Sequence, residues 1–239
     1  MNIGIVCNGR HLQARSWEMS VWGQSGQMGQ IPAAIRALQQ FSKMGRIVAL
    51  AFGTGASERN GIPEGQVMVD FMFANLHRLA TEFPYFSKMT GEELDRLRTR
   101  LSRVTVAETV SKNTAEEFLE TMKIFRDREV DLVIDVTSKT HAPRCMLELS
   151  KIWETLDYKP REGFLVVPAE TGYGAVPHGD QGVVIFEYPH RGDTPQEYVE
   201  LYELAKNLSQ HFLGRNAPRR RSLLDELRKL LETKTASAP

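Results

Sequence analysis

The chain has 239 residues, 41% of them hydrophobic, and its 30 lysines and arginines are balanced by 30 aspartates and glutamates. This length can bury a sizeable core, either in one domain or in one domain with an appendage. The zero net charge argues against a nucleic-acid-binding protein, which would carry an excess of basic residues. No run of about 18 apolar residues occurs and no leader is recognisable, so we expect a cytoplasmic protein without a membrane span.

The N-terminal segment predicts a first buried strand. Residues 3–7 are short and apolar, and the turn residues Asn8 and Gly9 follow them directly. The glycine-rich segment 17–29 also carries two tryptophans. Two interpretations of it stay open: a mobile flap over a site, or an irregular loop packed by its own aromatic residues.

A helix and a second strand follow. Pro32 suits the first turn of a helix that we expect to run to about residue 43, and the apolar run 46–52 predicts the strand. The strand ends in Gly53-Thr54-Gly55, whose backbone N–H groups are suited to hold an anion. The loop lacks the spacing of a P-loop or a dinucleotide-binding motif, so a tight turn remains the alternative.

The middle of the chain predicts two helices and a short strand. The first helix is expected over residues 64–80, and Thr90 with Glu93 forms a capping box that starts the second. A strand at 104–106 leads into the polar loop 108–114. Thr114 and Glu117 have the spacing of another cap, which would start the next helix.

Residues 130–136 are β-branched and apolar, which is typical of a central strand. The polar turn 137–141 follows, and Pro143 then opens a helix that should reach about residue 155. Cys7 and Cys145 lie far apart and lack the spacing of a metal site. We therefore expect buried, reduced thiols and no cysteine-based metal framework. Glu64 and Glu108 could hold a divalent ion, but no aspartate-rich cluster supports such a site.

Further strands are expected at 163–167 and 182–188, at one edge of the sheet. Strands that alternate with helices predict an α/β fold: a Rossmann-like, doubly wound, mostly parallel sheet with helices on both faces. Residues 1–192 would form this domain. Residues 193–239 would form a C-terminal helical appendage that packs on the domain or on a partner, including a second copy in a homo-oligomer.

Three segments resemble the YdcF/SanA/ElyC family of bacterial proteins, which have a Rossmann-like domain and largely undefined chemistry. The segments are GTGASERNGIPEGQVM, ETVSKNTAEE and VTSKTHAPRC, and the last two resemble the family patterns E-x-x-S-x-N-T-x-E and V-T-S-x-x-H-x-x-R. The resemblance covers about residues 3–155. The chain departs from the family in the residues after the first strand, in an inserted helix near residues 85–101, and in having no membrane anchor like that of the envelope-attached members.

Carried over position by position, the resemblance places the motif residues at three strand ends. Because the carboxyl ends of strands meet at one edge of an open sheet, these loops should form one crevice. We expect two catalytic residues there, His141 and Glu108. The ligand-binding candidates are Asn8, Gly9, Gly53, Thr54, Gly55, Glu64, Ser111, Asn113, Thr114, Thr137, Ser138 and Arg144.

Each of these residues also has a structural interpretation. Arg144 could bind an oxyanion, or it could pair with Glu148 four residues on. His141 could act as a general acid or base, or only as a hydrogen-bonding residue. Ser111 and Thr114 could cap a helix, and Asn113 could hold a turn.

Three functions stay open. The first is binding of a small phosphorylated or nucleoside-bearing metabolite in an enzyme that uses His141 and Arg144. The second is a non-catalytic protein that binds a nucleotide-like ligand such as S-adenosylmethionine. The third, which follows from the resemblance alone, is an accessory factor in cell-envelope metabolism. Fold does not decide among them.

Overall fold

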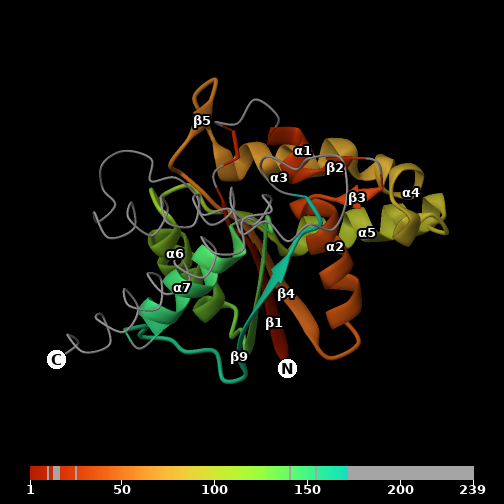
Figure 1. The fold of residues 1–239 in the computed structure, drawn as a ribbon. Coiled ribbons are helices and arrows are strands. Elements are labelled where there is room, and N and C mark those ends of the chain that lie inside the picture. Colours follow the sequence, from red (N-terminus) through yellow and green to blue (C-terminus); the bar gives the residue numbers. More distant parts are fainter. Residues whose placement is uncertain (10, 13–16, 25, 140, 154, 172–239) are drawn as a thin grey trace, which may run out of the picture. The chain divides into compact units, whose positions relative to one another are not determined.

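A parallel sheet of five strands organises the protein, and helices cover both of its faces (Figure 1). The computed structural model describes residues 1–9, 11–12, 17–24, 26–139, 141–153 and 155–171. These residues belong to one compact unit, residues 1–177. The strands of the sheet are β1 (Asn2–Cys7), β4 (Arg46–Phe52), β7 (Thr105–Ala107), β8 (Leu132–Thr137) and β9 (Gly163–Pro168). The predicted α/β, doubly wound fold is confirmed.

The strand order is β7-β4-β1-β8-β9, so β1 lies in the middle. From β1 the chain moves outward through β4 to β7, and it then returns to the other side of β1 for β8 and β9. The two halves of the sheet therefore diverge between β1 and β8. All carboxyl ends lie at the same edge because every pair is parallel.

The strands are apolar because the sheet is covered on both faces. Ile5 in β1 lies opposite Leu50 in β4 and Ile134 in β8, and all three side chains are fully buried. Side chains alternate between the two faces. Ile5 belongs to the core on one face, and Val6 belongs to the core on the other.

Three long helices pack on the first face: α2 (Gln30–Phe41), α3 (Glu64–Asn75) and α5 (Gly91–Val104). Two pack on the second face: α6 (Thr114–Asp127) and α7 (Ala142–Trp153). In Figure 1 the pair α6 and α7 lies across the sheet from α2.

Capping side chains set the starts of two helices. The predicted box at α5 is confirmed, since the Thr90 side chain accepts from the Glu93 N–H and Glu93 accepts from the Thr90 N–H. At α6 the predicted cap was wrong by one residue. Asn113 is extended and its Oδ1 accepts from the Glu116 N–H at 3.0 Å, whereas Thr114 is already helical.

The helix predicted over 64–80 is interrupted. It ends as α3 at Asn75, where the side-chain Nδ2 donates to the Phe71 carbonyl at 2.7 Å and competes with the helical ladder. The short turns that follow are η1 (Leu76–Arg78), α4 (Leu79–Glu82) and η2 (Pro84–Phe86).

The glycine-rich segment forms α1 (Trp17–Val21) and a small hairpin of β2 (Gly23–Gln24) and β3 (Gln27–Met28). Trp22 is 1% exposed, and its ring lies 6.1 Å from that of Phe71 and 5.9 Å from that of Phe83. The tryptophan therefore packs on rings from outside the segment, in α3 and after α4, and the segment is not an irregular loop. Its role as a flap stays a prediction.

A second hairpin, of β5 (Glu58–Arg59) and β6 (Ile62–Pro63), was not predicted. Asn60 and Gly61 at its tip have φ values of 54° and 75°, as a type I′ turn requires. The hairpin projects from the carboxyl-end side of the sheet (Figure 1).

Within the described ranges, no helix is both long and apolar enough to cross a bilayer. β9 lies at the sheet edge beside β8, as expected for the strand at 163–167. The predicted strand at 182–188, the domain boundary after residue 192 and the C-terminal helices lie outside the described residues.

Candidate functional site

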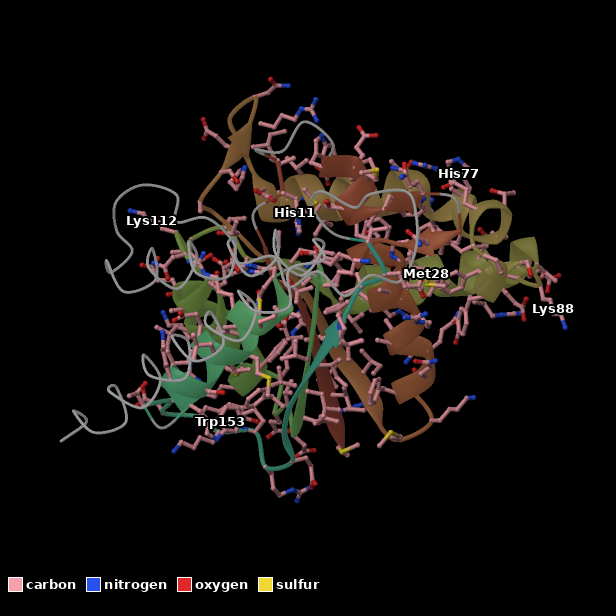
Figure 2. The ribbon with its side chains drawn as sticks, viewed as in Figure 1. His11, Met28, His77, Lys88, Lys112 and Trp153 are labelled. Carbon is pink, nitrogen blue, oxygen red and sulfur yellow. The ribbon has the colours of Figure 1, made fainter. Side chains whose placement is uncertain are left out.

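The predicted site lies where the two halves of the sheet diverge. In open α/β sheets, ligands bind outside the carboxyl ends of the strands at this point. The loops that follow β1, β4, β7 and β8 converge there. Figure 2 places His11 and Lys112 on this side of the sheet, whereas Trp153, at the end of α7, lies at the opposite side.

Glu64, at the start of α3, ties two of these loops together. Its side chain is fully buried. Oε1 accepts from the N–H groups of His11 and Leu12 in the loop after β1, and Oε2 accepts from the Ser57 hydroxyl in the loop after β4. The carboxylate therefore supplies the hydrogen-bond acceptor for backbone N–H groups of the loop after β1, which is a structural role.

Glu108 does the same for the loop after β7. Oε1 accepts from the N–H groups of Val110 at 2.6 Å and Ser111 at 2.8 Å, and Oε2 accepts from the Ser111 hydroxyl. The Thr54 hydroxyl lies 3.0 Å from the Ser111 carbonyl and joins this loop to the one after β4. Both oxygens of Glu108 therefore hold the loop in this structure. The expected catalytic role of Glu108 stays a prediction.

The glycine-rich loop after β4 is packed against protein. A Cβ on Gly55 would lie 2.1 Å from the Thr109 carbonyl oxygen, so only glycine allows the two loops to approach this closely. The predicted anion-holding role of Gly53, Thr54 and Gly55 remains a prediction.

Backbone carbonyls at the divergence point are already bonded. The Asn8 carbonyl accepts from the Thr137 hydroxyl at 2.9 Å and from Gln30 Nε2 at 2.7 Å. Gln30 Nε2 also donates to the Val136 carbonyl at 2.9 Å. Gln30 was not predicted as a site residue, yet it joins the ends of β1 and β8.

His141 lies just before α7 and is 6% exposed. Its Nε2 lies 3.5 Å from the Thr114 hydroxyl, which brings two predicted site residues from different loops together. The Ser138 carbonyl accepts from the N–H groups of His141 and Ala142 and so forms the turn into α7. The imidazole lies at the boundary between the rim of the site and the interior.

Two predicted residues lie on the outside of the site. Arg144 is exposed in the first turn of α7. Asn113 is also exposed, and its bonds to Glu116 are those of a helix cap, whereas the structural interpretation had given the cap to Ser111 and Thr114 and only a turn to Asn113. Gly9, by contrast, is buried beside His11 and has a φ of 137°.

Two buried acids beside His141 were missed from the sequence. Glu117 on α6 is 2% exposed and Asp135 in β8 is fully buried. Burial raises the pKa of each carboxyl to about 7, and the charge of nearby His141 opposes this rise. The sequence signal for Asp135 was an acid in the middle of an apolar strand.

Several buried polar atoms around these acids have no hydrogen-bond partner. They are both side-chain atoms of Asn8, one oxygen of Glu117, the hydroxyl of Thr121 and both oxygens of Asp135. Buried polar groups in folded proteins are nearly always bonded to protein, water or an ion. We call Asn8, Glu117, Thr121 and Asp135 the polar cluster.

Among the described residues, no three His, Cys, Asp or Glu side chains form a metal-binding group. Burial raises the pKa values of the Cys7 and Cys145 thiols well above the usual range, and nearby Asp135 adds to the rise. Both cysteines are buried, as predicted, and neither is in a disulfide in this structure.

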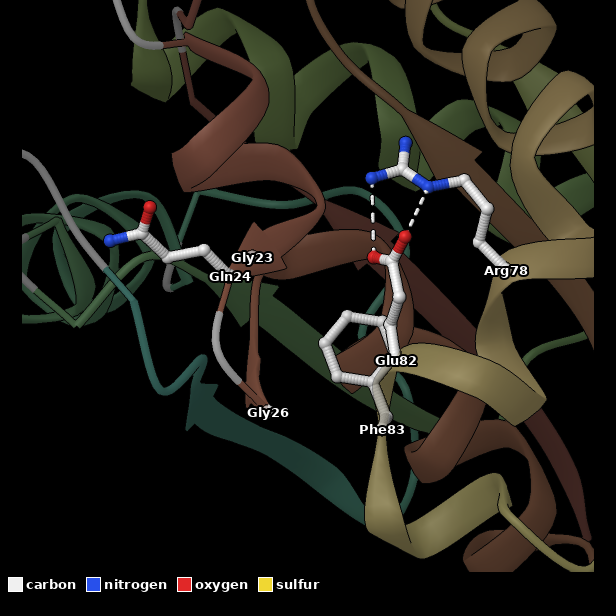
Figure 3. Close-up of a pocket in the computed structure, with 6 residues that line it drawn as sticks. All are labelled: Gly23, Gln24, Gly26, Arg78, Glu82 and Phe83. Carbon is white, nitrogen blue, oxygen red and sulfur yellow. Dashed lines mark hydrogen bonds and ion pairs between the residues drawn. The ribbon is translucent and has the colours of Figure 1, made fainter.

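A surface hollow of about 340 Å³ lies elsewhere, between the β2–β3 hairpin and α4 (Figure 3). Its charged groups neutralise each other, because Arg78 Nε and Glu82 Oε1 lie 2.7 Å apart. Trp22 Nε1 also donates to Glu82 at 2.8 Å. None of the predicted site residues lines this hollow.

No family model matches the chain, and the searches of curated proteins and solved structures returned no match either. The resemblance to the YdcF/SanA/ElyC family therefore stays a prediction.

Proposed function

We propose that the protein binds a small phosphorylated or nucleoside-bearing metabolite at the carboxyl ends of β1 and β8. The observation that carries this proposal is the concentration of buried polar side chains in the loops after β1, β4, β7 and β8. They gather at the divergence point of a doubly wound sheet, where ligand sites form in this architecture.

The anionic part of the ligand would lie on the outer rim. Arg144 is exposed in the first turn of α7, where the helix dipole and a guanidinium both favour an oxyanion. The interior would repel an anion, because the buried side chains there include Glu64, Glu108, Glu117 and Asp135. A phosphate is therefore assigned to the rim near Arg144.

If the protein is an enzyme, His141 is the residue that would move a proton. It lies between the exposed start of α7 and the buried acids. Glu117 and Asp135 are near enough for the histidine's charge to lower their pKa values against the effect of burial. We assign Glu108 to holding the loop, since its oxygens bond Val110 and Ser111.

A non-catalytic binding protein for a nucleotide-like ligand, such as S-adenosylmethionine, is the second candidate. The observation that favours it is the complete use of the Glu64 and Glu108 carboxylates in loop contacts. An accessory role in cell-envelope metabolism rests on the resemblance alone.

A thermal-shift screen against nucleotides, sugar phosphates, prenyl phosphates and S-adenosylmethionine tests the proposal. A ligand at about 100 times its Kd adds roughly 3 kcal/mol to the folded state. We expect Arg144→Ala to abolish the shift of an anionic ligand. Arg126→Ala, at the far end of α6, should leave that shift unchanged.

The screen can contradict the proposal, and turnover of the bound ligand decides between the two candidates. Binding that persists in Arg144→Ala, or a folded wild-type protein that responds to no ligand in the panel, would contradict the proposal. Turnover of the identified ligand that is lost in His141→Ala, with binding retained, would identify an enzyme. Binding without any turnover would favour the second candidate.

A further inference from the structure

The buried part of the site carries more negative than positive groups. Its buried ionisable side chains include four carboxyls, from Glu64, Glu108, Glu117 and Asp135, and two imidazoles, from His11 and His141. Over the described residues, no lysine or arginine is buried. A buried charge is expensive unless it is paired or hydrogen-bonded, so each carboxyl must be accounted for separately.

Two of the four carboxyls are satisfied by protein groups. Glu64 and Glu108 accept hydrogen bonds from backbone N–H groups and from serine hydroxyls at both oxygens. Glu117 and Asp135 differ, because one oxygen of the first and both oxygens of the second have no hydrogen-bond partner. The unsatisfied acid oxygens therefore lie in the polar cluster.

A neutral side chain whose polar atoms also lack hydrogen-bond partners lies near Glu117. Asn8 is fully buried, and both of its side-chain atoms lack a partner. The position of a Cβ on Gly53 would be 3.6 Å from Asn8 Oδ1 and 3.4 Å from Glu117 Cδ. The amide and the carboxyl thus face the same small volume beside Gly53.

The remaining oxygens come from neighbouring positions. Thr121 lies four residues after Glu117 on α6, hence on the same face of that helix, and its hydroxyl has no partner. Asp135 enters from β8 and Asn8 from the end of β1, two adjacent strands. An amide oxygen, a hydroxyl and carboxylate oxygens are the ligand types that hard cations take.

We propose that the polar cluster formed by Asn8, Glu117, Thr121 and Asp135 binds a small monovalent cation, Na⁺ or K⁺. The ion would bind oxygens that have no N–H or hydroxyl donor, with only the weakly donating Cys145 thiol beside Asp135, and it would neutralise part of the buried negative charge. The inference does not rest on the proposed metabolite, which would be bound outside this cluster at the rim.

A monovalent ion fits better than a divalent one. Mg²⁺ loses water reluctantly and usually keeps several water ligands, for which a cluster of buried atoms is a poor site. In the described part of the chain, no group of three His, Cys, Asp or Glu side chains is arranged to bind a metal. An alkali ion can instead use the neutral oxygens of Asn8 and Thr121 beside the two carboxylates.

Thermal unfolding of the full chain at pH 8 and constant ionic strength provides the test. LiCl, NaCl, KCl, MgCl2 and CaCl2 are each compared with tetramethylammonium chloride, whose cation is too large for the site. For an ion at about 100 times its Kd, we expect Tm to rise by roughly 5 °C or more above the tetramethylammonium value. NaCl or KCl should give this rise.

Isosteric variants locate the effect. Glu117→Gln and Asp135→Asn should lose the ion-specific rise in Tm. Glu120→Gln should keep it, because Glu120 lies on the same helix but pairs with Lys123 at the surface. Equal Tm values in all monovalent salts, a rise given only by divalent ions, or a rise that persists in both cluster variants would overturn the proposal.

Crystals of the wild-type protein soaked in a Tl⁺ salt give a second test that does not depend on the folding of variants. The expected result is an anomalous peak within bonding distance of Asn8, Glu117 and Asp135. Occupied Tl⁺ sites elsewhere with none at the cluster would overturn the proposal. The metabolite screen has a separate readout, Arg144→Ala, so the two proposals can fail independently.

Discussion

Replacing Asp135 by asparagine should stabilise the protein at high pH and have little effect at low pH. The Asp135 carboxyl is fully buried, and no N–H or hydroxyl group donates to its oxygens; the Cys145 thiol, a weak donor, lies beside it. Burial is the main reason that its pKa rises from 3.8 to about 7, while the charge of His141 acts in the opposite direction. Asparagine has nearly the same shape and carries no charge at any pH.

The direction of this pH dependence follows from the pKa of the Asp135 carboxyl in the unfolded chain and in the folded protein. The unfolded chain ionises Asp135 near pH 4 and the folded protein near pH 7, so the unfolded state has fewer bound protons between these values. The wild-type protein therefore loses stability as pH rises from about 4 to about 7, by roughly 1.4 kcal/mol per pH unit. The loss reaches about 4 kcal/mol above pH 7.

Urea unfolding at pH 4.5, 6, 7 and 8, with tetramethylammonium chloride as the only salt, measures the effect. The free energy of unfolding of Asp135→Asn should exceed that of wild type by only about 1 kcal/mol at pH 4.5 and by about 4 kcal/mol at pH 8. His141 and Glu117 are charged groups near Asp135 and are present in both proteins, whereas the nearby Cys7 and Cys145 thiols stay protonated because burial raises their pKa values.

Asp131→Asn is the matched control. Asp131 immediately precedes β8, where its Oδ2 accepts from the Asn2 N–H at 2.7 Å and its Oδ1 lies 3.6 Å from Arg161. Losing this partnered charge should lower stability at pH 8. A lower free energy of unfolding for Asp135→Asn than for wild type at pH 8, or a difference between the two that does not change with pH, would contradict a buried carboxyl with a raised pKa.

Three further predictions concern the Glu64 contacts, the Gly55 loop and the start of α5. Glu64→Ala leaves the N–H groups of His11 and Leu12 without an acceptor, so the free energy of unfolding in urea should fall by about 3 kcal/mol. Exposed Glu58→Ala should change it by less than about 0.5 kcal/mol. Similar losses in the two variants would contradict the role of Glu64 in holding the loops. Gly55→Ala places a Cβ 2.1 Å from the Thr109 carbonyl and should lower Tm by several degrees in a thermal scan; an unchanged Tm would show that the loops can separate freely. Thr90→Ala removes the α5 capping box and should lower the free energy of unfolding in urea by about 1 kcal/mol. An unchanged free energy of unfolding would show that the start of α5 does not need the hydroxyl.

The strands were the most predictable elements because burial on both faces leaves a direct signature in the sequence. Residues 46–52 were predicted as a strand and form β4 with the same bounds. The Asn60-Gly61 hairpin also had a clear signal, since this dipeptide favours the type I′ turn. The helix break at Asn75 had a weaker signal, because it depends on one side chain bonding to its own helix.

The polar positions of the site were harder to predict than the strands. Glu64 and Glu108 were recognised as site residues, but their use as loop clamps depends on distances between loops that are remote in sequence. Glu117 was interpreted as a capping partner, and its burial depends on how α6 is rotated about its axis. Gln30 has no local feature that indicates its bonds to the ends of β1 and β8.

The central claim is that a small metabolite binds where β1 and β8 diverge. Hydrogen–deuterium exchange with and without the ligand found in the thermal-shift screen tests its location most directly. We expect ligand-dependent protection in residues 108–113 and at the start of α7, with no change in α5. Protection confined to the β2–β3 hairpin and α4, around the hollow of Figure 3, would contradict it.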